Sequence, residues 1–190
     1  PRDATTLEIR AVEKSWGPEF VRFDLGFAAS GVGNLEAVLR ADLDRTWVNT
    51  RGGEWRSAIQ FGQQTLVQSS FYQPLDIPQH FFVEPLVKFE SNLEDIYDNG
   101  SRVAVYALRQ LYGQLDAGMN LGTRVQVRAG LRSGWLDAQR DTGATIFPEL
   151  SRETDSSAQL RVVYDTRDQV GLPTSGTFLN ARVMSSGGWL

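Results

Sequence analysis

The sequence predicts an all-β protein, a meander of about nine long antiparallel strands. Three observations predict this class. Apolar and polar residues alternate with period two in run after run, glycine and proline cluster between the runs, and no apolar pattern with helical spacing continues beyond a turn or two. The alternation is clearest in residues 35–44, because a helix with that spacing would scatter its leucines around all sides.

The first half of the chain is predicted to hold four strands, each ended by turn residues. Every run alternates apolar with polar side chains, and many of the polar ones are charged. Residues 31–34 contain two glycines and an asparagine, and residues 48–53 end in Gly-Gly, so both segments are expected to be turns. We expect strands over residues 19–29, 35–44, 54–61 and 67–71.

The second half is predicted to hold five more strands. Pro85 lies inside one run and predicts a local irregularity, because proline cannot donate a hydrogen bond to a neighbouring strand. Residues 93–100 and 137–155 are polar without clear alternation, and we expect exposed loops there. We expect strands over residues 81–90, 102–116, 124–132, 158–164 and 177–184.

The connection before the last strand carries the densest turn chemistry. Proline fixes φ there, and glycine accepts positive φ. Its Asp and Arg side chains could form an acid pair or a cation site, but we favour turn chemistry, with Asp accepting backbone N–H groups and Arg pairing locally. The residues that define this turn are Asp165, Thr166, Arg167, Asp168, Pro173, Thr174, Ser175 and Gly176.

The composition gives little support for catalysis, metal binding or nucleic-acid binding. The chain has no cysteine and one histidine, His80, which we expect to be a solvated turn residue. It has no Gly-x-Ser-x-Gly motif of an esterase. The pI is about 5.1, and the arginines are scattered along the runs instead of forming a basic patch. We therefore predict no enzymatic activity, no cofactor, no metal site and no nucleic-acid partner.

The alternation by itself admits a soluble antiparallel barrel or sandwich, whose strands also bury one face. Three features favour a transmembrane β-barrel segment. Several runs are as long as a tilted membrane strand, which needs about 9–11 residues. Charges of both signs occur in mid-strand, where they would line a wet lumen. Aromatic residues flank the turns, as in an interfacial girdle, namely Trp16, Trp47, Trp55, Phe71, Tyr72, Phe81 and Trp135.

The phase of the alternation assigns a facing to individual residues. The residues expected to face the lumen are Arg22, Asp24, Arg40, Asp42, Arg56, Arg124, Arg128 and Arg132. The residues expected to face lipid are Phe23, Leu39, Leu43, Val127 and Leu131.

Four stretches also resemble the outer-membrane surface-antigen barrels of the BamA/TamA type, and most closely the C-terminal barrel of patatin-like (PlpD-like) type Vd autotransporters. They are residues 13–18 (EKSWGP), 46–55 (TWVNTRGGEW), 71–75 (FYQPL) and the 165–176 turn. The resemblance implies the N-terminal half of a sixteen-stranded barrel, with residues 15–190 in the barrel and 1–14 the last strand of a POTRA-like domain. It also implies that the 165–176 turn is periplasmic.

The resemblance implies a translocator of the bacterial outer membrane that anchors or exports a passenger domain. A patatin-like lipase encoded upstream is one candidate passenger, and any lipase activity would lie there. The expected partners are outer-membrane lipid, a passenger or client polypeptide, and a second copy joined through the open sheet edges near residues 21–27 and 178–184. The alternative function is that of a soluble antiparallel β-barrel or sandwich that binds a small ligand.

Overall fold

The computed structural model describes residues 19–29, 35–62, 64–169 and 171–187. Within these ranges the chain forms nine strands and no helix long and apolar enough to cross a membrane. The strands are β1 (Glu19–Ala29), β2 (Leu35–Arg45), β3 (Glu54–Phe61), β4 (Gln64–Pro74), β5 (Phe81–Asp98), β6 (Ser101–Leu121), β7 (Val125–Gly143), β8 (Leu150–Asp165) and β9 (Phe178–Ser186).

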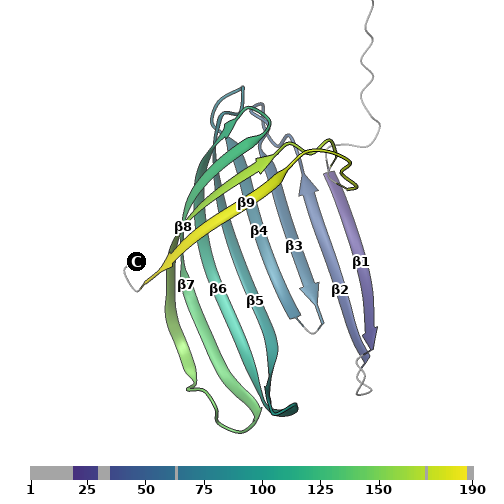
Figure 1. The fold of residues 1–190 in the computed structure, drawn as a ribbon, viewed down its shortest axis with the longest axis vertical. Coiled ribbons are helices and arrows are strands. Elements are labelled where there is room, and N and C mark those ends of the chain that lie inside the picture. The colour runs from purple at the N-terminus through teal and green to yellow at the C-terminus, as the bar shows by residue number, and fades with distance from the viewer. Residues whose placement is uncertain (1–18, 30–34, 63, 170, 188–190) are drawn as a thin grey trace, which may run out of the picture.

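All nine strands belong to one antiparallel sheet with the order β1-β2-β3-β4-β5-β6-β7-β8-β9. Each strand therefore pairs with its neighbours in sequence, which confirms the all-β meander that the alternation predicts. The sheet curls but does not close, so β1 and β9 are its two edges (Figure 1). The segments expected to form a POTRA strand, residues 1–14, and Trp16 lie outside the described residues.

The predicted loops at residues 93–100 and 137–155 are wrong over most of their length, because only residues 99–100 and 144–149 are connections and the rest is strand. β5 continues to Asp98, β7 continues to Gly143, and β8 begins at Leu150. The four strands β5–β8 are 16 to 21 residues long, and they extend the sheet at the end opposite the 166–177 connection (Figure 1). We call this part, residues 91–109 and 137–155, the extension. Apolar and polar side chains are mixed on both of its faces, so the regular alternation of the rest of the sheet does not continue there.

The irregularity predicted at Pro85 is present on one side only. Pro85 pairs with Leu115 of β6 without a shift in register. On the β4 side the pairing stops between Ser70↔Leu86 and Gln73↔Val83. Because proline has no N–H to donate, the ladder opens toward one neighbour and stays continuous toward the other.

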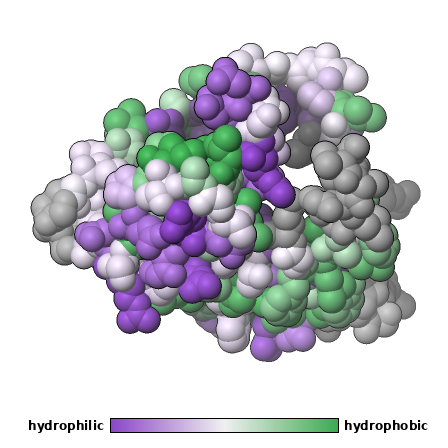
Figure 2. All heavy atoms as spheres, turned by 90° about the horizontal axis from the view of Figure 1, so that it is seen from below, coloured by the Kyte–Doolittle hydropathy of each residue, from purple (hydrophilic) through white to green (hydrophobic). Residues whose placement is uncertain are grey.

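The register gives the sheet two chemically different faces. One, the apolar face, carries large exposed hydrophobic side chains, such as Phe23 at 74%, Leu39 at 51% and Leu131 at 50% exposed. The other, the polar face, holds charged and amide groups, several of them shielded from solvent by their neighbours on the curled sheet. Figure 2 views the molecule from the end of the extension and shows hydrophilic atoms gathered there, with hydrophobic atoms along one side of the sheet.

Candidate functional site: the charged network of the polar face

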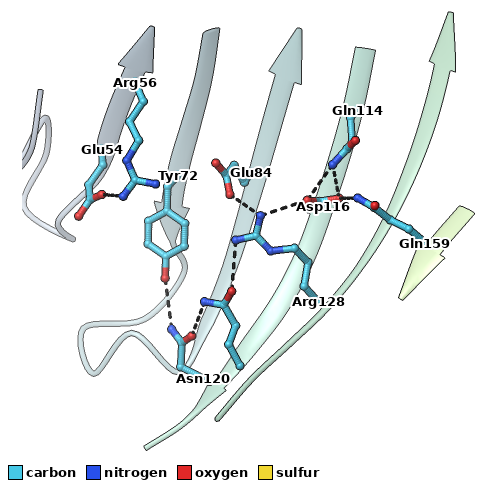
Figure 3. Close-up of polar contacts among 10 residues, drawn as sticks. Glu54, Arg56, Tyr72, Glu84, Gln114, Asp116, Asn120, Arg128 and Gln159 are labelled. Carbon is cyan, nitrogen blue, oxygen red and sulfur yellow. Dashed lines mark hydrogen bonds and ion pairs between the residues drawn. The ribbon is translucent and has the colours of Figure 1, made fainter. Parts of the chain in front are cut away.

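Arg128 of β7 is the centre of the polar face. Its Nη1 atom lies 2.7 Å from Glu84 Oε2 on β5 and 3.2 Å from Asp116 Oδ2 on β6 (Figure 3). The guanidinium also lies 5.0 Å from the centroid of the Phe82 ring, an arrangement that favours a cation on an aromatic face. Arg128 therefore joins three neighbouring strands by charge as well as by the ladder.

Asp116 is 2% exposed, and its carboxylate accepts amide hydrogen bonds in addition to the ion pair with Arg128. Gln114 Nε2 donates to both of its oxygens at 3.0 Å, and Gln159 Nε2 of β8 donates to Oδ1 at 3.2 Å. Burying an unpaired carboxylate costs several kcal/mol, and these donors offset that desolvation cost for Asp116. The network spans β5 to β8.

A chain of amides continues the network toward the turns. Arg128 Nη2 donates to Gln126 Oε1 at 3.4 Å, and Gln126 Nε2 donates to Asn120 Oδ1 at 2.9 Å. Asn120 Nδ2 in turn donates to the Tyr72 hydroxyl at 3.2 Å and to the Gln79 carbonyl at 2.8 Å. The network thereby reaches β4 and the connection before β5 (Figure 3).

Tyr72 is consequently not a girdle residue, because its ring lies on the polar face. The ring packs against Phe82 with a centroid distance of 4.8 Å. Its hydroxyl accepts a hydrogen bond from Asn120. Tyr72 follows Phe71 directly, and alternate residues of a strand project to opposite faces, so only one of the two can belong to the apolar face.

Two glycines make room for the network, and the sequence reasoning missed both. Gly118 lies opposite Phe82 and Arg128, and Gly130 lies opposite Asp116. A Cβ atom on Gly118 would come within 2.5 Å of the Phe82 ring. Glycine inside a strand often marks the close approach of a neighbouring group. Both glycines alternate in phase with the charged residues of their strands, and this position is the sequence signal that could have indicated their role.

A second cluster lies on the polar face nearer to the extension. Arg132 Nη2 pairs with Asp155 Oδ2 of β8 at 2.5 Å, and Gln110 Nε2 of β6 donates to the same oxygen at 2.5 Å. The Arg132 guanidinium lies 4.7 Å from the centroid of the Tyr112 ring. This cluster repeats the arrangement around Arg128, with an arginine held between a carboxylate and an aromatic ring.

The N-terminal strands carry smaller ion pairs on the same face. Arg40 Nη2 lies 2.7 Å from Asp42 Oδ1, and Arg56 pairs with Glu54. Arg22 lies opposite Asp42 in the β1–β2 register, and Asp24 lies opposite Arg40. Charges of opposite sign thus face each other across the strands, an arrangement that stabilises a sheet.

The structure places seven of the eight residues expected to face a lumen together on the polar face. Arg124 is the exception, because it lies in the exposed turn between β6 and β7, before the first residue of β7. The five residues expected to face lipid, Phe23, Leu39, Leu43, Val127 and Leu131, share the apolar face. What each face contacts stays a prediction.

The turn between β8 and β9 is held by local carboxylate chemistry, as predicted. Asp165 accepts the backbone N–H of Arg167 at 3.0 Å, and its Oδ2 lies 2.8 Å from Arg167 Nη2. Asp168 accepts the Thr174 hydroxyl and the backbone N–H groups of Thr174 and Ser175. These donors lower the pKa of Asp168 below its ordinary value, the Thr174 hydroxyl most of all.

His80 lies in the exposed connection between β4 and β5, as expected, where its Nδ1 atom is 3.1 Å from Asp76 Oδ2. Asp76 also accepts the Phe81 N–H at 2.9 Å and the His80 N–H at 3.2 Å. The pKa of Asp76 is lowered below its ordinary value, and the hydrogen bond from the Phe81 N–H is the largest cause. Among the described residues no group of three or more His, Cys, Asp or Glu side chains could hold a metal ion.

Comparison with known proteins adds no relative. No family model matches the sequence, and no curated protein or solved structure is significantly similar to it. The resemblance to BamA/TamA-type barrels therefore stays a prediction. The two faces of the sheet are therefore the features that bear on function.

Proposed function

We propose that this chain is part of a translocator barrel of the bacterial outer membrane, which anchors or exports a passenger polypeptide. On this proposal the apolar face contacts lipid, and the polar face lines a wet lumen. The observation that carries the proposal is the contrast between a broad exposed apolar face and a charge-paired polar face on one curled sheet.

The apolar face has the height that a membrane strand needs. On β6 the residues of this face are apolar or glycine from Leu111 to Leu121, a stretch of eleven residues, and Arg109 follows in the same phase. A transmembrane strand needs about 9–11 residues. Arg109 pairs with Ser91 of β5 and Asp137 of β7, so a polar row crosses three strands at the same register. We take this row as the start of the part outside the membrane.

Three polar side chains on the apolar face form hydrogen bonds with one another. Trp55 Nε1 donates to Ser69 Oγ at 2.8 Å, and Ser57 Oγ lies 2.9 Å from the same oxygen. An unsatisfied donor in hydrocarbon costs several kcal/mol, whereas in water it would be hydrated. Mutual pairing of these three groups is therefore what a lipid-facing surface requires.

The polar face suits a lumen because its charges compensate each other. Carboxylates on β5, β6 and β8 pair with the guanidinium groups of Arg128 and Arg132 on β7, and neighbouring amides donate to these carboxylates. A wall of this kind stays hydrated and rigid without concentrating one sign of charge. It gives a client polypeptide no strongly charged surface to adhere to.

A soluble barrel or sandwich that binds a small ligand is the weaker alternative. In a sandwich a second sheet would cover the apolar face. Within the described residues one sheet contains all nine strands, and the large side chains of the apolar face stay exposed. A contiguous apolar patch of this extent is unusual on a soluble monomer.

The extension, and not the length of the connections, is the basis of the proposed orientation. The connections at the 166–177 end have 3 to 12 residues, whereas the β5–β6 and β7–β8 connections at the extension end have two and six. The start of β1 and the 166–177 connection lie at the same end of the sheet. The extension lies at the other end (Figure 1). In outer-membrane barrels the segments that project furthest beyond the membrane lie on the extracellular side. The proposal therefore places the 166–177 connection in the periplasm and the extension outside the cell.

Neighbouring residues on opposite faces test the proposal. A spin label at Leu39, on the apolar face, is expected to be quenched by a lipid-soluble reagent in reconstituted membranes. A label at Arg40, on the polar face, is expected to respond to a water-soluble reagent. Equal responses at the two positions, or a chain that stays in the aqueous fraction as a monomer, would contradict the membrane assignment.

A further inference from the structure

A separate apolar cavity of about 450 Å³ opens on the polar face within the extension. The register explains how the cavity forms, since Glu94 lies opposite Tyr106, and Leu108 lies opposite Ala138, all in the same phase. Its lining residues are Glu94, Ile96, Tyr106, Leu108, Ala138, Phe147, Pro148 and Leu150. Seven of these eight lining residues are uncharged, and Glu94 is the exception.

The connection between β7 and β8 folds over this cavity and is anchored there. The Tyr106 hydroxyl accepts the backbone N–H groups of Ile146 and Phe147 at 3.2 and 3.0 Å, and it donates to the Phe147 carbonyl at 3.0 Å. Tyr106 is itself 4% exposed. The rings of Tyr106 and Phe147 meet nearly edge to face, with an interplanar angle of 68°. The cavity thus has an aromatic corner held in place by three hydrogen bonds.

Glu94 differs from the carboxylates of the network described above. Within the part of the chain that the structure describes, it accepts from the Asn92 amide at 2.6 Å and pairs with no cationic side chain. Arg140 lies opposite Tyr106 on the same face, but its guanidinium donates to the Gly143 carbonyl and the Thr145 hydroxyl. A negative charge therefore remains uncompensated at the edge of an aromatic cavity.

The extension around the cavity is also the source of the whole net charge of the chain. Residues 91–109 and 137–155 contain eight acidic and four basic residues, which gives −4, and the chain as a whole has a formal charge of −4. The rest of the sequence is therefore balanced. An acidic surface around a concave site raises the local concentration of cations.

We propose that this cavity binds a small organic cation, with a quaternary or alkylated ammonium group on an apolar body. The ammonium group would lie against the Phe147 ring and the Glu94 carboxylate, and the apolar body would contact Ile96 and Leu108. Aromatic rings together with a carboxylate recognise such cations, because the cation is attracted to the ring face and needs little hydration. A neutral ligand would leave the Glu94 carboxylate without a cationic partner.

The proposal can be tested with benzyltrimethylammonium as the probe and the 190-residue chain in a nonionic maltoside. Saturation-transfer NMR titration is expected to show benzyltrimethylammonium bound about fivefold more tightly than the neutral benzyl alcohol, and benzenesulfonate not bound. Glu94→Gln is expected to remove most of this preference. Phe147→Leu keeps the site apolar and is expected to weaken cation binding about threefold.

Glu149→Gln is the matched control, because Glu149 lies in the same acidic extension but does not line the cavity. It removes the same charge and is expected to leave the preference for the cation nearly unchanged. Equal affinity for the cation and the alcohol, or equal losses in Glu94→Gln and Glu149→Gln, would overturn the proposal. The titration requires no membrane and no transport, so a failure of the barrel assignment would not affect it.

Discussion

Gly130 of β7 lies directly opposite Asp116 of β6, and a Cβ atom at position 130 would come within 1.8 Å of Asp116 Oδ1. No side chain larger than hydrogen fits there while Asp116 keeps its place beside Arg128. The position of the buried carboxylate therefore depends on the absence of a side chain on the neighbouring strand.

Gly130→Ala is expected to destabilise the folded chain by about 1–3 kcal/mol, because Asp116 must leave its donors or the strands must separate. The free energy of unfolding in urea, followed by tryptophan fluorescence, measures the effect. Gly113→Ala is the control, since Gly113 lies on β6 and a Cβ atom there meets no atom within 4 Å. Equal stabilities of the two variants would show that Asp116 is not confined as the structure has it.

Arg128→Met is expected to cost about 3 kcal/mol, because it leaves the carboxylates of Glu84 and Asp116 without their cation in a shielded site. Arg56→Met is the matched control, since Arg56 is 56% exposed in its pair with Glu54 and an exposed pair contributes about 0–1 kcal/mol. Both losses are measured by urea unfolding. A loss as small for Arg128 as for Arg56 would mean that solvent reaches the network freely.

The sequence predicted the fold class because strand alternation is a local signal. Nine alternating runs predict nine strands. The phase of each run also assigns most residues to the face on which they lie, because alternate residues of a strand project to opposite faces. Residues 93–98, 137–143 and 150–155 of the extension are strand although their sequence predicts loops, because neither face there keeps a regular alternation of apolar and polar residues. There the evidence for strand lies in hydrogen bonds between neighbouring chain segments, which no local pattern records.

The polar network was predictable only in part. That Arg128 and Arg132 face the same side follows from their spacing of four residues along one strand. Their carboxylate partners lie on other strands, and the pairing depends on the register of three hairpins. Only the structure therefore shows that Asp116 is contacted by Gln114 and Gln159 and lies opposite Gly130.

The turn before β9 is expected to lose its order in acid. The pKa of Asp168 is lowered in the folded chain, so the carboxylate stabilises the turn fully above the ordinary Asp pKa of about 3.9. This contribution falls as the pH drops through the lowered folded pKa. Amide hydrogen exchange of Thr174 and Ser175, whose N–H groups donate to Asp168, reports the change.

Asp168→Asn provides the comparison for this pH dependence. An amide oxygen is a weaker acceptor than a carboxylate, so exchange at Thr174 should be faster than in the unchanged chain at neutral pH. It should also vary little with pH beyond the intrinsic exchange rate. Identical pH profiles for the two chains would show that another group orders this turn.

The two edges of the sheet determine how copies of the chain should associate. Among the strands that the structure describes, β1 and β9 each pair with one neighbour, so their outer backbone groups are available to another strand. Two copies joined at these edges would form a closed barrel of eighteen strands, within the known range for outer-membrane barrels. We expect the 190-residue chain to self-associate through the two edges.

Cysteines on a shared face test this association. Arg22 of β1 and Asn180 of β9 both lie on the polar face, so Arg22→Cys with Asn180→Cys should give a disulfide between chains. Because the register between copies is not fixed in advance, Arg182→Cys and Met184→Cys serve as alternative partners on the same face. Arg22→Cys with Leu179→Cys is the control, because Leu179 lies on the apolar face and should not react. A monomeric chain with a disulfide between positions 22 and 180 would instead mean that the nine strands close on themselves, and the open sheet would then be wrong.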